Sequence, residues 1–177
     1  MLHRATLRYT VVAAALMGWH GMVASFEAKV TDPGFTITVP ALPNIALQRQ
    51  AAAPASSPPS PLLLGDDGTY KVSVALSAMH SAVSARECAG SGLRSILSRP
   101  GLPSRDNIYR APLSAQTFLV LYVLAAGSQP TLHAHLLSAV GERYCTEVHF
   151  SRLARTGEDV DDWRKSFQGA RIDEATR

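Results

Sequence analysis

The sequence predicts a small α/β fold, a βαβαβα sandwich of two or three layers, and three observations support this class. Residues 70–76 alternate between apolar and polar side chains, which is the period of a strand with one buried face. Residues 84–99 carry apolar side chains at helical spacing, and residues 117–126 are nearly all apolar, which is typical of a strand covered on both faces. The connections are long enough for parallel pairing, and an antiparallel α+β meander is the alternative.

The first 25 residues have the form of a secretory signal peptide. A basic start that contains Arg4 and Arg8 precedes the apolar residues 11–19, and small residues stand at the positions before a cut after Ser25 or Ala24. The apolar run is about half the roughly 20 residues needed to span a bilayer, so we expect cleavage and no stable membrane span in the mature chain. The predicted location is the periplasm or the outside of a bacterial cell.

The net charge and the absence of known catalytic motifs limit the classes of function that the sequence indicates. The chain has a formal charge of +3, and loss of the two leader arginines leaves 3 − 2 = +1. This charge is too close to neutral to indicate nucleic acid as a partner. The sequence contains no G-x-S-x-G elbow, C-x-x-C pair, H-E-x-x-H helix or P-loop. It therefore predicts no catalytic set, cofactor or metal, and it favours a protein that is not an enzyme.

Composition divides the remaining chain into four parts. Residues 26–50 contain β-branched side chains but also three prolines, which predicts an extended N-terminal arm, either loose or added to the sheet edge of a partner. Residues 51–61 read AAAPASSPPSP and predict a semi-rigid linker. A globular domain is then expected at residues 62–169, followed by a polar tail at residues 170–177.

The first helix of that domain is predicted to begin at a capping box and to carry a disulfide. Ser84 and Glu87 have the spacing of the box. Cys88 follows in the first turn, and the only other cysteine is Cys145, so an exported chain favours a single bridge between them. The closed loop of 145 − 88 = 57 residues predicts a stabilisation of roughly 4 kcal/mol. Gly90 and Gly92 are expected to let the helix approach the sheet closely.

Residues 128–141 contain two histidines, and four features favour a helix there. Ser128 can cap its start, Pro130 suits the first turn, and Gly141 suits the position after the last turn. An apolar stripe recurs every fourth residue, at Leu132, Leu136 and Val140. On a helix, His133 and His135 would point about 200° apart and could not hold one metal ion.

The alternative for the same residues is a strand that forms a hairpin with residues 144–150. A three-residue loop at residues 141–143 would place His135 opposite His149 and bring Glu147 near, a donor set that suits zinc. His133 would share this face because the period of a strand is two residues. A two-residue loop would send His149 to the other face. After this segment, residues 158–169 predict a short helix with an acidic start.

The function predicted from these features is an exported, non-enzymatic accessory or binding protein of the bacterial envelope, with a protein partner there or outside the cell. It could belong to a secretion, conjugation or surface assembly. One alternative is a secreted hydrolase or nuclease in which His149 and Glu147, with His80 as a further candidate, act as acid–base groups. Another is an inhibitor or immunity protein that binds through the arm or through its arginines.

Overall fold

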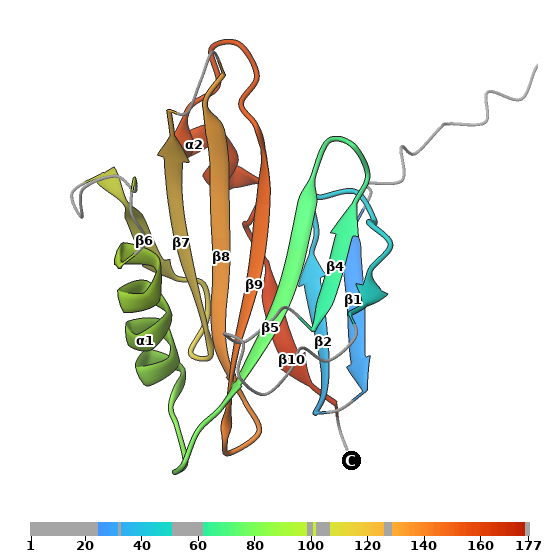
Figure 1. Ribbon diagram of the computed structural model, residues 1–177, viewed down its shortest axis with the longest axis vertical. Helices are drawn as coiled ribbons and strands as arrows, with labels where there is room; N and C mark the ends of the chain where they lie inside the picture. The colour runs from blue at the N-terminus through green and yellow to red at the C-terminus, as the bar shows by residue number, and fades with distance from the viewer. Residues whose placement is uncertain are drawn as a thin grey trace, which may run out of the picture.

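The computed structural model describes residues 25–31, 33–50, 62–98, 101, 107–125 and 129–175 (Figure 1). The expected signal peptide, apart from Ser25, and the expected linker at residues 51–61 lie outside these residues. The elements are β1 (Phe26–Thr31), β2 (Gly34–Val39), β3 (Gln48–Arg49), β4 (Leu63–Asp66), β5 (Lys71–Ala78), α1 (Ala85–Leu97), β6 (Tyr109–Pro112), β7 (Thr117–Leu124), β8 (Thr131–Val140), β9 (Tyr144–Leu153), α2 (Val160–Lys165) and β10 (Arg171–Glu174).

The main sheet has seven strands in the order β3-β4-β5-β9-β8-β7-β6, and every pair in it is antiparallel. The expected parallel α/β sandwich is therefore wrong, and the antiparallel α+β alternative is right in its class. Short loops join β6, β7, β8 and β9 in succession, and a short loop can connect only antiparallel neighbours. After β5, the helix α1 carries the chain to β6 at the far edge of the sheet. The strands β7, β8 and β9 then return across the sheet in order, so β9 becomes the neighbour of β5.

A second sheet of three strands, in the order β1-β2-β10, packs on the inner face of the main sheet. Phe26 of β1 is fully buried, and its ring meets the ring of Phe150 of β9 edge to face at 5.2 Å. Ile172 of β10 pairs with Ile37 of β2, and both are buried in the same core. The described residues of the expected arm, and residues 170–175 of the expected tail, thus pack on the predicted domain, because their apolar side chains complete one core with it.

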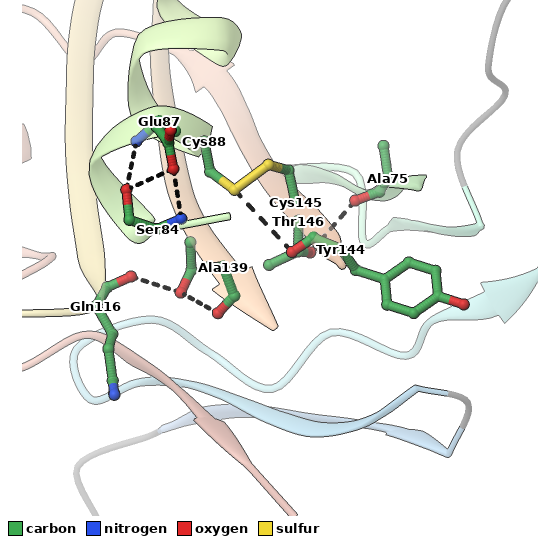
Figure 2. The surroundings of a disulfide bond; sticks show 10 residues. Ala75, Ser84, Glu87, Cys88, Gln116, Ala139, Tyr144, Cys145 and Thr146 are labelled. Carbon is green, nitrogen blue, oxygen red and sulfur yellow. Dashed lines mark hydrogen bonds between the residues drawn. A yellow bond between two sulfur atoms is a disulfide. The ribbon is translucent and has the colours of Figure 1, made fainter. Parts of the chain in front are cut away.

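The outer face of the main sheet is covered in part by α1, so the structure has three layers (Figure 1). The predicted capping box is present: the Ser84 side chain accepts from the Glu87 backbone N–H, and the Glu87 carboxylate accepts from the Ser84 backbone N–H. The backbone N–H and the hydroxyl of Ser84 both donate to the Glu87 carboxylate, and these hydrogen bonds hold the pKa of Glu87 below its usual value. The disulfide between Cys88 and Cys145 then joins the first turn of α1 to β9 (Figure 2).

Of the two glycines in α1, only Gly92 lies in close contact with the sheet. A Cβ atom at residue 92 would lie 2.6 Å from a methyl carbon of Leu137, which is 2% exposed. A Cβ atom at Gly90 would meet only the end of the Arg94 side chain, at 3.7 Å. The expectation of close approach is thus confirmed for Gly92 and wrong for Gly90.

The helix α2 is shorter than the predicted residues 158–169, and it covers the inner face beside the small sheet. Asp159 caps its start by accepting from the Asp162 backbone N–H. Trp163 is fully buried, and the guanidinium of Arg152 lies 4.7 Å from the centre of its ring. Arg152 also pairs with Glu158, and this hydrogen bond holds the pKa of Glu158 below its usual value. Neither of the helices in the described residues has the length and apolar character to cross a membrane.

Candidate functional site

The histidine-rich segment is the strand β8, so the expected helix is wrong. Leu132, Leu136 and Val140 recur every fourth residue, and four is a multiple of the strand period, so one face of a strand holds them as well. They face the inner core, while their intervening partners Ala134 and Ser138 are buried too. Gly141 has a φ of +60°, the left-handed conformation that a helix end would also have required, but it opens a hairpin loop.

The hairpin between β8 and β9 has the three-residue loop of the strand alternative. Val140 pairs with Tyr144, which leaves residues 141–143 in the loop and places His135 opposite His149. Because side chains alternate along a strand, His133, His135, Glu147 and His149 all project from the outer face. The structure therefore brings together the three histidines and the carboxylate that the sequence alone left unresolved.

The histidine rings form a stacked group with Tyr122 of β7. The ring centres of His135 and His149 are 4.3 Å apart with planes inclined by 13°, and those of Tyr122 and His133 are 4.9 Å apart at 11°. Tyr122 also stacks on His135 at 5.5 Å, and His133 stacks on His149 at 5.2 Å. We call Tyr122, His133, His135, Glu147 and His149 the histidine cluster.

Hydrogen bonds fix the orientation of the rings in the histidine cluster. The Nδ1 atom of His135 lies 2.8 Å from the Oε1 atom of Glu147, and its Nε2 atom lies 3.0 Å from the hydroxyl of Tyr122. An ionised carboxylate can only accept, so Nδ1 of His135 donates to Glu147, and in the neutral form of the ring Nε2 then accepts from Tyr122. The Nδ1 atom of His133 and the Nε2 atom of His149 are 2.9 Å apart, so one donates and the other accepts.

Solvent exposure differs across the histidine cluster, which has a buried end at Tyr122 and His135 and a more exposed end at His149. His135 is fully buried and Tyr122 is 2% exposed, whereas His133, Glu147 and His149 are half-buried. His135 is thus shielded from solvent by its neighbours, which include Tyr122, Glu147 and His149. The groups that a molecule outside can touch lie at the open end, and His149 is the most important of them because it borders two surface hollows.

The two hollows adjoin on the outer face and share Ser73 and His149. The first has a volume of about 550 Å³ and lies over β3, β4, β5 and β9. The second has a volume of about 350 Å³ and lies between α1 and the strands β5 and β9, with Glu147 in its wall. Ser73 and His149 are cross-strand partners, so the two hollows meet at one pair of residues. We call the two hollows together the outer trough.

The remaining sequence candidates fall in different places. His80 is exposed and follows β5 beyond Ala78, at the opposite end of that strand from Ser73, so it does not join His149. Cys145 also projects to the outer face, where α1 covers it, while His149 lies farther along β9 beside the open part of that face. Tyr122 and Ser73 were not identified as site residues from the sequence. Tyr122 stands in a nearly all-apolar strand, and Ser73 stands in a regular alternating strand, so neither local pattern indicates a site.

The described residues contain no group of three or more histidine, cysteine, aspartate or glutamate side chains placed to hold a metal ion. The nitrogen and oxygen atoms of the histidine cluster contact one another instead. No family model matches the chain, and a search of the curated proteins found no match. The fold and site thus define a class only: a disulfide-closed antiparallel β-sandwich with a helix and a polar trough on its outer face.

Proposed function

We propose that this chain is an exported, non-enzymatic accessory or binding protein of the bacterial envelope and that the outer trough contacts its partner. The observation that supports this most strongly is the incomplete cover of the outer face. The helix α1 closes one part of that face, and about 550 Å³ and 350 Å³ of adjoining hollow remain over the other part. Ligand sites in proteins have volumes of about 300–1,000 Å³.

The histidine cluster favours binding over catalysis. His135 has both ring nitrogens within hydrogen-bonding distance of side chains, and it is fully buried. His133 and His149 contact each other through ring nitrogens. A network of this kind holds side chains in one orientation, which lowers the entropic cost of binding a partner. The disulfide supports the exported location, because such bridges persist in oxidising compartments.

Site-specific photo-crosslinking in the native envelope tests this function. A crosslinking side chain at Ser77, which is exposed and lines the second hollow, should capture a defined partner. The same group at Lys29, an exposed residue of β1, is the matched control and should not. Ser73→Phe should remove the Ser77 product by filling the trough. Equal products at both positions, or a protein that stays in the cytoplasm with its leader attached, would contradict the proposal.

A secreted hydrolase is the second candidate, since Glu147 and His149 both line the second hollow. Two such groups beside a cavity can supply a general base and a general acid. This candidate expects wild-type protein to cleave bis-p-nitrophenyl phosphate or p-nitrophenyl acetate, and it expects His149→Gln to abolish cleavage with an unchanged melting temperature. No cleavage of either ester by the oxidised wild-type protein would count against it.

A further inference from the structure

We infer that the outer trough binds a neutral, polyhydroxylated chain, that is, an oligosaccharide. This inference rests on the proposed function, because it names the ligand of the same face. Three features of the trough support it independently: the kind of polar side chain that lines it, the balance of charge along it, and its extended shape with one ring at the middle.

Serine hydroxyls are the most frequent polar side chains of the lining, beside apolar residues such as Leu64 and Leu137. The serines are Ser73, Ser77, Ser91, Ser95 and Ser151. The amides of Gln48 and Gln50 add to them at the end of the first hollow. Hydroxyls and amides each both donate and accept hydrogen bonds. Sugar hydroxyls also do both, so an oligosaccharide can use the donor and the acceptor capacity of this lining together.

The charges along the trough nearly cancel. Lys71 and Asp66 lie at the first hollow and are register partners on adjacent strands, and Glu147 lies at the second hollow. No described arginine lines either hollow. A site for phosphate or a nucleic acid needs a surplus of cationic side chains, which this trough does not have. Carboxylates, by contrast, accept from paired hydroxyls of a neutral sugar.

The shape fits a chain better than a compact molecule. The hollows follow the outward residues of β5 from Lys71 to Ser77, a distance of about 20 Å at the usual rise of a strand. The small side chains of Ser91 and Ser95 lie on the part of α1 that borders the second hollow. Midway, the half-buried ring of His149 borders both hollows, and its stacked neighbours fix its plane. A fixed aromatic face is suited to pack against the C–H side of a sugar ring.

The test is an NMR titration of the oxidised mature protein with tri-N-acetylchitotriose and with maltotriose, read on assigned backbone amides and the ring of His149. At least one trisaccharide should shift Ser73, Ser77 and His149. Ser73→Phe should weaken that binding by about tenfold or more, because its ring would occupy the junction of the hollows. His149→Gln should weaken it by about threefold or more, and Lys29→Phe on β1 should leave it unchanged.

Three results would overturn the inference. The first is no shift with either trisaccharide at millimolar concentration. The second is shifts of the trough residues with spermidine, inorganic phosphate or a neutral hexapeptide in their place. The third is saccharide binding that survives both trough variants. If saccharides fail while the Ser77 crosslink to a protein persists, only the ligand class is wrong. If both fail, the proposed function is wrong as well.

Discussion

Replacing both cysteines by alanine should lower the free energy of unfolding by about 4 kcal/mol. The bridge joins residues 57 positions apart, and the loop it closes contains α1, β6, β7 and β8. Loop-closure entropy for that length is about 14 cal/mol/K, which gives about 4 kcal/mol at 25 °C. This is a large fraction of the roughly 5–15 kcal/mol that stabilises a typical domain. Native strain, or structure that remains in the unfolded chain without the bridge, would reduce it.

The assay is urea unfolding of the mature protein, followed by the fluorescence of Trp163, since the only other tryptophan lies in the predicted leader. With a slope of about 2 kcal/mol/M, the midpoint of the double variant should fall by about 2 M. Reduced wild-type protein is the control and should unfold at nearly the same midpoint as the variant. A loss below about 1 kcal/mol would refute the reasoning, because the loop would then not be restrained by this bridge.

Two further changes have matched controls. Gly92→Ala should destabilise the protein by about 1–3 kcal/mol, because the new methyl group would overpack Leu137. Gly90→Ala is the control and should stabilise the protein by up to about 1 kcal/mol through helix propensity. Equal effects of the two variants in thermal unfolding would contradict the close contact between Gly92 and Leu137. The pKa of Glu158 is lowered by Arg152, so this pair stabilises the protein above the unfolded pKa of the carboxyl, near pH 4.5, and the contribution is lost as the pH falls through the lower folded pKa. Glu158→Gln should therefore cost about 2 kcal/mol of unfolding free energy at pH 7 and flatten the acid limb of a stability–pH profile. Asp162→Asn removes an exposed ion pair and should leave that profile nearly unchanged. Overlapping profiles for wild type and Glu158→Gln would show that the pair of Arg152 and Glu158 contributes nothing.

Local signals in the sequence predicted local structure well. The capping box at Ser84 and Glu87 and the alternation of β5 each depend on residues close in sequence, and both are confirmed. The disulfide between Cys88 and Cys145 was predictable because an exported chain with two cysteines has one way to pair them. These features required no knowledge of how distant segments meet.

Long-range pairing was the part that the sequence could not predict. The three prolines of residues 26–50 argued against a regular sheet, yet they lie outside the strand bounds: β1 ends before Pro33, and β2 lies between Pro33 and Pro40. The second partner of β2, after β1, is β10, which is more than 130 residues away, and no local pattern encodes that contact. The helix prediction for the residues of β8 was wrong for a different reason. An apolar residue at every fourth position is compatible with both a helix and a strand, and only the position of this segment between β7 and β9 decides between the two.

The central claim is that the β8–β9 register assembles the histidine cluster on the outer face, and the protonation of its ring nitrogens tests this most directly. A long-range ¹H–¹⁵N spectrum of the mature protein at pH 8 reports which nitrogen of each histidine carries the proton. His135 should have its proton on Nδ1, held by Glu147, with Nε2 accepting from Tyr122. A proton on Nε2 of His135, with all three histidines behaving as independent exposed rings, would contradict the account.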